Sequence, residues 1–277
     1  MRFWKMHGLG NDYIVVDNKE EKINGKQAAE LAKRLCERRL SVGADSLLLA
    51  SSSKAADVKM RVFNADGSEA EMCGNGIRCF AKYCYENGIV KKKEFSVETL
   101  SGIKNVWLTL RQGEVSVVKV DMGSPSWERS SLPMTGHGTC INVDLMVDSQ
   151  LFKVTCLSIG NPHCVIFVDK VDDFPVEQIG RKIEKHEAFP KRTNVGFVQV
   201  LNPRELKLRV WERGCGETLA CGTGSCAAAA AANKLGKVDS KVTVHVLGGD
   251  LKVEVAKSLF LSGAAEKVFE GTLFKEE

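Results

Sequence analysis

The feature that most constrains this chain is a short turn sequence that occurs twice, about half the chain apart. The segment CGNG begins at Cys73, and the related segment CGTG begins at Cys221, 148 residues later in a chain of 277. The same offset places Gly88 on Gly236, each 15 residues after its cysteine. Matches at a fixed offset indicate one structural unit written twice.

Further matches extend this repeat toward both ends of the chain. Each pair stands next to apolar segments that recur in the same order in the two halves. The matched pairs are Gly10 and Asn11 with Gly160 and Asn161, Val42 and Gly43 with Val195 and Gly196, and residues 100–102 with residues 247–249. Because identities are sparse, we interpret the repeat as structural.

Hydrophobic periodicity gives each repeated element a type. Apolar side chains recur every three or four positions in residues 28–35 and 176–183, which predicts two helices, with Pro175 suited to the first helical position. Apolar residues alternate on both sides of residues 112–113 (QG) and 248–249 (GG), which predicts two hairpins. The chain is therefore predicted to be α+β, with two similar lobes.

The segment that follows each repeated cysteine is predicted to be a buried helix. Residues 227–232 are six consecutive alanines, and Gly236 provides a C-terminal stop. Residues 77–86 run into Asn87 and Gly88 in the same way. A helix with so little polar surface is expected to lie inside the strands of its own lobe.

Composition excludes several classes of protein. The chain is 44% hydrophobic and 27% charged, as in soluble globular proteins. A net charge of +4 and 7% aromatic residues give no nucleic-acid signature, so we expect no nucleic-acid partner. The N-terminal residues lack an apolar signal segment, and no apolar run could span a bilayer, so we expect a cytoplasmic protein without a membrane partner.

Ten cysteines without a CxxC pair favour reduced thiols over disulfides, and no metal site is expected. Cys73 and Cys221 each precede a helix start, where the helix dipole attracts anions and is expected to lower the pKa of a thiol. The other cysteines are expected to be buried and inert. They are Cys36, Cys79, Cys84, Cys140, Cys156, Cys164, Cys215 and Cys226.

Two equivalent thiols suggest one particular chemistry. If the lobes face each other across a pseudo-twofold axis, Cys73 and Cys221 flank one cleft. One thiolate could then remove a proton from a carbon, and the other thiol could return a proton to the opposite face, inverting the configuration. Two helix N-termini aimed at the adjacent carboxylate would stabilise the charge that develops, so pyridoxal phosphate would not be required.

Five segments resemble the diaminopimelate epimerase family, in order and along the whole chain. They are HGLGNDY (7–13), FNADGSEAEMCGNGIRC (63–79), SIGNPHC (158–164), RTNVGFVQV (192–200) and WERGCGETLACGTGSC (211–226). The resemblance implies two lobes, each a β-barrel-like sheet around a central helix, with the active site between them. It also implies cofactor-independent interconversion of LL- and meso-diaminopimelate in lysine biosynthesis, by a homodimer.

The resemblance also assigns roles to individual residues. Cys73 and Cys221 would be the acid/base pair, aided by His163 and Glu212. The residues implied in substrate binding are Asn11, Asn64, Gly74, Asn75, Asn161, Asn194, Glu212, Arg213, Gly222 and Thr223. Ser46 departs from the longer amide or glycine that the family often carries, and a substrate contact there would be lost or made through water. The expected lobes are residues 1–118 with 264–277, and residues 119–263.

Three alternatives stay open at this point. A related two-cysteine racemase could act on proline or hydroxyproline, since specificity rests on a small energy difference. A cysteine hydrolase or acyltransferase could use one cysteine with His163, leaving the second thiol idle. A non-enzymatic thiol module could bind metal or respond to oxidation.

Overall fold

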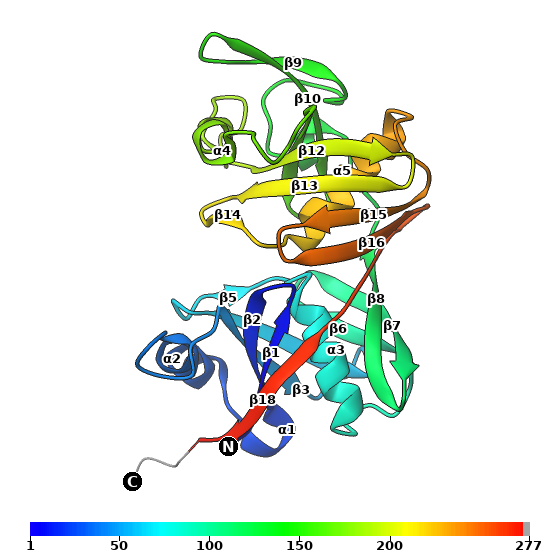
Figure 1. Cartoon of the computed structure of the whole chain (residues 1–277). Coiled ribbons are helices and arrows are strands. Elements are labelled where there is room, and N and C mark those ends of the chain that lie inside the picture. The colour runs from blue at the N-terminus through cyan, green and yellow to red at the C-terminus, as the bar shows by residue number, and fades with distance from the viewer. Residues whose placement is uncertain (274–277) are drawn as a thin grey trace. The chain divides into compact units, whose positions relative to one another are not determined.

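The computed structural model describes residues 1–273 of the chain. It divides into two compact units, Met1–Asp121 with the segment from Ser262 onward, and Met122–Leu261 (Figure 1). We call these the N-terminal lobe and the C-terminal lobe. Residues 274–277, which we expected to end the N-terminal lobe, lie outside the described residues.

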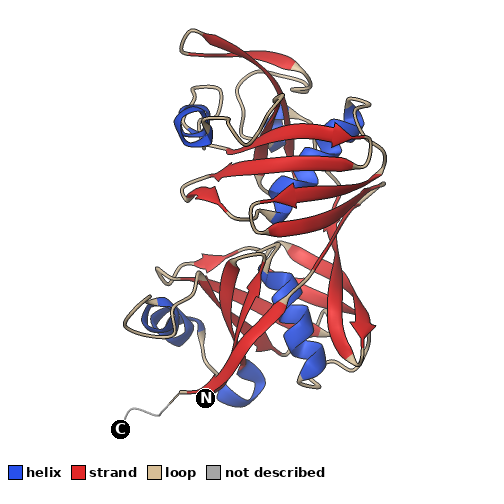
Figure 2. Ribbon diagram, in the orientation of Figure 1, coloured by secondary structure: helices blue, strands red, loops and turns tan. Residues whose placement is uncertain are grey.

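The strands of the N-terminal lobe surround one of its long helices, residues 76–86, and the other, residues 25–36, lies at the outside of the lobe (Figure 2). Its strands are β1 (Arg2–Gly8), β2 (Asn11–Asp17), β3 (Ser46–Ser51), β4 (Val58–Asn64), β5 (Glu69–Ala70), β6 (Glu94–Thr99), β7 (Gly102–Arg111), β8 (Glu114–Gly123) and β18 (Glu266–Thr272). Its helices are α1 (Asn18–Glu21), α2 (Gly25–Cys36) and α3 (Gly76–Glu86). Strand β18 pairs antiparallel with β1.

The C-terminal lobe is built from a similar set of elements. Its strands are β9 (Val143–Val147), β10 (Gln150–Ser158), β11 (Pro162–Phe167), β12 (Asn194–Asn202), β13 (Glu205–Glu212), β14 (Gly216–Thr218), β15 (Lys241–Val246), β16 (Gly249–Val255) and β17 (Leu259–Gly263). Its helices are η1 (Arg129–Ser131), α4 (Val176–Glu184) and α5 (Gly222–Lys234).

Strand pairing repeats between the lobes. In the N-terminal lobe β1 pairs antiparallel with β2, β2 parallel with β3, β3 antiparallel with β4, and β4 parallel with β6. Strands β10, β11, β12, β13 and β15 follow the same order of directions in the C-terminal lobe. Helices α2 and α4 occupy equivalent connections, as do α3 and α5. The predicted α+β fold with two similar lobes is confirmed.

The strand register corrects one of the matches made from sequence. Ser46 is the parallel partner of Tyr13, and Asn194 is the parallel partner of His163, so Ser46 and Asn194 hold equivalent places. The match of Gly43 with Gly196 is therefore wrong. Gly43 lies in the turn before β3, with φ +71, whereas its proposed match lies within β12. The α2 and α4 connections differ in length, which shifted the alignment.

The helices that follow the two cysteine turns are buried as predicted. Helix α5 packs against β10, β11, β12, β13, β15 and β16, and its alanine side chains allow these strands to come close. Helix α3 packs against β1, β2, β3 and β7. Each helix ends at a glycine of positive φ, +69 at Gly88 and +67 at Gly236, which suits the left-handed position after a helix.

The outer helices also follow the predicted spacing. Asn24 and Gln27 form a capping box at the start of α2. Pro175 is the N-cap of α4, one position earlier than expected. The β7–β8 hairpin turns at residues 112–113 as predicted, whereas the β15–β16 hairpin turns one residue early, at 247–248. Over residues 1–273, no helix is long and apolar enough to cross a membrane.

Candidate active site

The two cysteine turns share one backbone contact, although α5 begins directly after Cys221 and α3 begins three residues after Cys73. The backbone N–H of Gly76 donates to Cys73 Sγ at 3.4 Å, and the backbone N–H of Gly224 donates to Cys221 Sγ at 3.3 Å. Each sulfur is thus held over the first turn of its helix, α3 or α5. A sulfur at a helix start is exposed to the positive end of the helix dipole, which favours its thiolate form.

The second glycine of each Cys-Gly-x-Gly turn makes room for the sulfur. A Cβ at Gly76 would lie 3.2 Å from the Cβ and 3.4 Å from the Sγ of Cys73. A Cβ at Gly224 would lie 3.1 Å and 3.3 Å from the same atoms of Cys221. These contacts are tighter than ordinary van der Waals separations. The glycines therefore permit the close contact between helix backbone and sulfur.

In the N-terminal lobe, Cys73 is in contact with a tyrosine that the sequence reasoning did not select. The hydroxyl of Tyr13, on β2, lies 3.0 Å from Cys73 Sγ and also donates to Asn11 Oδ1. Asn75 Nδ2 lies 3.5 Å from the same Asn11 oxygen. Of the predicted residues of this lobe, Asn11, Cys73 and Asn75 are therefore brought together.

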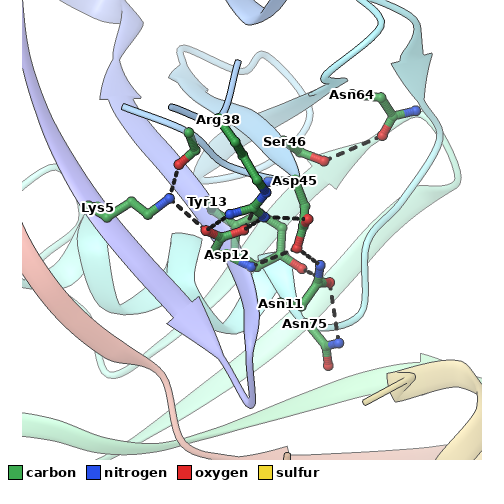
Figure 3. A network of polar contacts seen from close by, with 10 residues as sticks. Lys5, Asn11, Asp12, Tyr13, Arg38, Asp45, Ser46, Asn64 and Asn75 are labelled. Carbon is green, nitrogen blue, oxygen red and sulfur yellow. Dashed lines mark hydrogen bonds and ion pairs between the residues drawn. The ribbon is translucent and has the colours of Figure 1, made fainter. Parts of the chain in front are cut away.

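Asn11 is supported by a network of charged residues behind it (Figure 3). Its Nδ2 group donates to Asp45, whose carboxylate also pairs with Arg38 at 2.9 Å. Arg38 and Lys5 both bind Asp12, each at 2.7 Å. Burial raises the pKa of Asp12, but the hydrogen bonds from Arg38 and Lys5 outweigh this effect and hold the pKa at about 2. The network fixes which way the Asn11 amide points.

Asn64 lies at the end of β4 and is held by serines. Ser46 Oγ donates to Asn64 Oδ1 at 3.4 Å (Figure 3). Asn64 Nδ2 donates to Ser68 Oγ at 3.0 Å. Ser46, the departure from the family pattern, is only 6% exposed and is the cross-strand partner of Asn64. Its hydroxyl therefore orients a predicted substrate-binding side chain.

In the C-terminal lobe, Cys221 is buried near a carboxylate. Glu212, at the end of β13, accepts a hydrogen bond from Thr218 Oγ1 at 2.5 Å. Burial and then the negative charge of Glu212 raise the pKa of Cys221 well above its usual value, although Thr223 and the Gly224 N–H act in the opposite direction. The expected lowering of the thiol pKa is wrong for Cys221, because desolvation by burial outweighs the effect of the helix dipole.

A chain of hydrogen bonds leads from His163 toward the same thiol. His163 Nε2 lies 3.0 Å from Asn161 Oδ1, Asn161 Nδ2 donates to Thr223 Oγ1 at 3.2 Å, and Thr223 Oγ1 lies 3.5 Å from Cys221 Sγ. Burial and then the positive charge of Arg213 lower the pKa of His163 to about 3. The imidazole is thus neutral at pH 7, and its Nε2–H is the donor to Asn161.

Asn194 links the start of β11 to Arg213, another predicted residue of this lobe. Its Nδ2 donates to Pro162 O at 2.8 Å, and its Oδ1 accepts from the backbone N–H of Arg213 at 2.9 Å. The Arg213 side chain is exposed, with Nη1 3.5 Å from Lys191 O. Its guanidinium therefore extends from a turn that Asn194 holds in place.

Gly74 and Gly222 directly follow the two cysteines at the helix starts. The carbonyl of Gly74 accepts from Arg78 Nη1 at 3.1 Å, which anchors the N-terminal turn to its helix. Gly222 is the first residue of α5.

The repeat explains how Tyr13 could have been recognised. Asn11 and Tyr13 stand two residues apart on β2. Asn161 and His163 stand two residues apart where β11 begins. Tyr13 therefore holds the position equivalent to that of His163, a predicted site residue. Extending the Gly-Asn match by two residues would have selected it. A tyrosine in a strand otherwise reads as an ordinary core residue, which is why it was passed over.

The remaining cysteines follow the predicted pattern with one exception. All ten are thiols, and seven of the eight expected to be inert are buried. Cys215 is exposed, because it lies in the turn between β13 and β14, so its assignment as a buried residue is wrong. Within residues 1–273 no three His, Cys, Asp or Glu side chains are grouped so as to hold a metal ion.

The two-lobed α+β fold places this protein in a class of proteins that share the fold and have been solved by crystallography. It is shared with a PhzF-family phenazine biosynthesis protein from Bacillus anthracis, with a TM-score of 0.73 and 17% identity over 99% of both chains. A probable proline racemase from Agrobacterium radiobacter has a TM-score of 0.71 and 16% identity, covering 99% of this chain and 93% of that one. At these identities the likeness concerns the fold.

Within that class, the chain belongs to the diaminopimelate epimerase family, whose profile matches residues 3–128 and 155–268. It is 52% identical to the diaminopimelate epimerase of Pelotomaculum thermopropionicum over 274 residues, covering 98% of each chain. It is 50% identical to that of Moorella thermoacetica over 275 residues, again covering 98% of each. The family predicted from the five motifs is confirmed.

Proposed function

We propose that this protein interconverts LL- and meso-diaminopimelate, an isomerisation in lysine biosynthesis. The observation that carries the mechanism is the repeated cysteine turn, in which each sulfur accepts a backbone N–H at the start of a buried helix. Family membership along nearly the whole chain supports the substrate. The reaction needs no pyridoxal phosphate if the protein groups stabilise the carbanion themselves.

Cys73 and Cys221 are the two bases of this scheme. The raised pKa of Cys221 favours its thiol form at neutral pH, so in the resting enzyme this residue is the proton donor. Cys73 then acts as the thiolate that removes the Cα proton. One turnover leaves Cys73 with the Cα proton and Cys221 as the thiolate, because Cys221 has given its proton to the product. In this state the enzyme binds the opposite isomer, and the two cysteines exchange roles.

The carbanion is stabilised by the helix starts. Removal of the Cα proton places charge on the adjacent carboxylate, and the backbone N–H groups of Gly74, Asn75, Gly222 and Thr223 are its donors. These groups stand at the N-termini of α3 and α5, where the dipoles favour negative charge. Because the charge grows as the proton leaves, the interaction is stronger in the transition state than in the ground state.

The remaining predicted residues bind the ends of the substrate. The Arg213 guanidinium suits the distal carboxylate, which it can bind through two parallel hydrogen bonds. Neutral His163 orients the reacting amino group. The amide side chains that bind the other polar groups are Asn11, Asn64, Asn161 and Asn194. We further propose that the two cysteines face one cleft between the lobes and that the enzyme is a cytoplasmic homodimer.

Solvent hydrogen exchange tests this function. Reduced protein is incubated with LL-diaminopimelate in D2O, and the Cα–H signal and the isomer ratio are followed by NMR and chiral chromatography. We expect deuterium at one stereocentre together with the meso isomer. Cys73→Ala and Cys221→Ala should each lower the rate by roughly 10²–10⁴-fold, because each removes one proton-transfer group.

A cysteine outside the turns provides the control. Cys36 lies on α2, and Cys36→Ala should keep near-normal turnover. If either Cys73→Ala or Cys221→Ala also keeps near-normal turnover, the two-base scheme is wrong. Exchange with proline or 4-hydroxyproline in place of diaminopimelate would indicate the related racemase, and a trapped thioester without exchange would indicate acyl transfer.

A further inference from the structure

Tyr13 carries a fully buried hydroxyl group in direct contact with a proposed catalytic sulfur. Its side chain is 0% exposed, and its oxygen lies 3.0 Å from Cys73 Sγ. The ring is packed across the first turn of α3, where a Cβ on Gly76 would lie 3.3 Å from Tyr13 Cε1. Packing from two sides therefore leaves the phenol little freedom to move away from the thiol.

We propose that Tyr13 is a further catalytic residue, whose hydroxyl reverses its hydrogen bond to Cys73 as this residue alternates between thiol and thiolate. The proposal rests on the proposed function, which requires Cys73 to take both forms. It assigns to the phenol the task of stabilising the thiolate without exchanging its own proton.

The thiol state is the first of the two arrangements. The phenol has one proton, which it donates to Asn11 Oδ1, so its oxygen is left to accept the S–H of Cys73. The orientation of Asn11 is settled by Asp45, because an ionised carboxylate can only accept and must face the Asn11 Nδ2 group (Figure 3). The Asn11 oxygen therefore faces Tyr13.

The thiolate state requires the second arrangement. The sulfur then has no proton to donate, so the phenol turns about its C–O bond and donates to the thiolate. Asn11 Oδ1 keeps Asn75 Nδ2, 3.5 Å away, as a donor. No covalent bond breaks, and the sulfur gains a donor in addition to the backbone N–H of Gly76.

The phenol keeps its proton in both arrangements. Burial, and then a charge on Cys73, raise the pKa of Tyr13 well above its usual value of about 10. The other titratable or charged groups that act on the phenol are Cys79, which raises its pKa, and Arg78, which lowers it. Tyr13 therefore remains an O–H donor at neutral pH and beyond its usual titration range.

The equivalent position of the C-terminal lobe has a different partner. His163 stands in the place of Tyr13 and is bonded to Asn161, which reaches Cys221 through Thr223. Cys221 is instead influenced by the Glu212 carboxylate, which opposes ionisation. A neutral donor beside one thiol and a carboxylate beside the other would bias the resting enzyme toward thiolate at Cys73 and thiol at Cys221.

The test measures ionisation of Cys73 without requiring turnover. Full-length wild type and Tyr13→Phe are treated briefly with iodoacetamide between pH 6 and 10, and alkylation of the Cys73 peptide is quantified by mass spectrometry. Loss of a hydrogen bond to a charged group should raise the midpoint of this curve by about one to two pH units. Tyr85→Phe, which makes the same chemical change on α3, should leave the midpoint unchanged.

A second measurement protects the test against misfolding. The chain has three tyrosines, and their replacement with fluorotyrosine makes each phenol a stronger donor. The Cys73 midpoint should then fall in the wild-type chain and stay where it is in the Tyr13→Phe chain. A folded Tyr13→Phe protein whose midpoint matches wild type, or a fluorinated wild type with no shift, would overturn the proposal.

Catalysis separates this proposal from the function on which it rests. If the function is correct, Tyr13→Phe should lower kcat/KM about tenfold or more and move the acidic limb of its pH profile upward by the same shift as the alkylation midpoint. A shifted midpoint in a protein that does not epimerise diaminopimelate would retain the Tyr13–Cys73 interaction and reject the function. An unshifted Cys73 midpoint in a protein that epimerises diaminopimelate would reject the Tyr13–Cys73 interaction and retain the function.

Discussion

At the scale of single residues, the sulfur of each proposed catalytic cysteine is fitted against a glycine that has no room for a methyl group. The close N–H···S contact at Gly76 and Gly224 is possible because nothing projects from the Cα atom. The glycines of the repeated turn therefore leave room for the sulfur atoms and let the helix backbone come close to them. In this they differ from Gly88, whose surroundings are open and whose conformation, φ +69, is what demands glycine.

We predict that Gly224→Ala displaces the sulfur of Cys221. The added methyl group would lie 3.1 Å from Cys221 Cβ and 3.2 Å from Val210 Cγ2, so the turn must shift. Overpacking of this kind costs about 1–3 kcal/mol of stability. We expect kcat/KM to fall at least tenfold, because a misplaced proton-transfer group loses its alignment. Kinetics and thermal unfolding of the purified variant measure both effects.

Gly88→Ala is the matched control for this prediction. Its methyl group would meet no atom within 4 Å, so its cost comes from the positive φ alone, about 1 kcal/mol. It should lose stability and keep kcat/KM. Equal losses of activity in the two variants at equal stability would show that the N–H···S contact is unimportant.

At the scale of elements, α4 positions the end of β13 and the turn after it, which carry the predicted residues Glu212 and Arg213. Glu184, buried at the end of α4, accepts from Trp211 Nε1 at 2.8 Å and from the backbone N–H of Gly214 at 3.0 Å. These two donors lie on either side of Glu212 and Arg213 in the chain. Burial raises the pKa of Glu184, but the hydrogen bonds outweigh it and hold the carboxylate ionised.

We predict that Glu184→Gln loosens this turn. A glutamine presents one acceptor oxygen and an NH2 group, so one of the two donors loses its partner, at a cost of about 1–3 kcal/mol. Because Arg213 is proposed to bind the distal end of the substrate, we expect KM to rise several-fold with a smaller change in kcat. Steady-state kinetics with diaminopimelate measure KM and kcat separately.

The neighbouring exposed Glu187 supplies the control for the α4 prediction. Glu187→Gln makes the same chemical change on the surface and should alter neither KM nor stability. If Glu184→Gln instead lowered kcat without a change in KM, the role assigned to α4 in holding the Arg213 turn would be wrong.

At the scale of the whole molecule, buried thiols couple stability to alkaline pH. Burial raises the pKa of Cys36 and of Cys79 to about 12, and it raises those of Cys84 and Cys221 well above their usual value. In the unfolded chain these thiols ionise near pH 8.5. A folded pKa above the unfolded pKa means that the stabilisation is complete below about pH 8.5 and is lost as pH rises toward the folded values.

We predict that the unfolding temperature falls between pH 8.5 and 10.5 in the presence of a reductant. Each buried thiol contributes a slope of about 1.4 kcal/mol per pH unit in this range. Cys36→Ala should remove one such contribution and flatten the dependence, whereas Cys215→Ala, at an exposed site, should leave the slope unchanged. Calorimetry across this pH range checks the prediction, which an unfolding temperature constant to pH 10.5 would contradict.

Much of the architecture follows from local patterns in the sequence. Alternating apolar residues predicted the hairpin at residues 112–113, and helical spacing predicted α2 and α4, because side-chain periodicity reports which face is buried. Six consecutive alanines predicted the buried helix α5. The shifted match of Gly43 shows the limit of this reasoning, since the register between strands depends on pairing rather than on nearby residues.

The sequence by itself determined the repeated turn, the two similar lobes, the family and the residues proposed to act. Only the tertiary structure decided what surrounds each sulfur: the contact of Tyr13 with Cys73, the raised pKa of Cys221 and the exposure of Cys215. The physical reason is that periodicity and turn chemistry are set by neighbours along the chain. Hydrogen bonding and desolvation at an atom are instead set by groups that folding brings from distant strands.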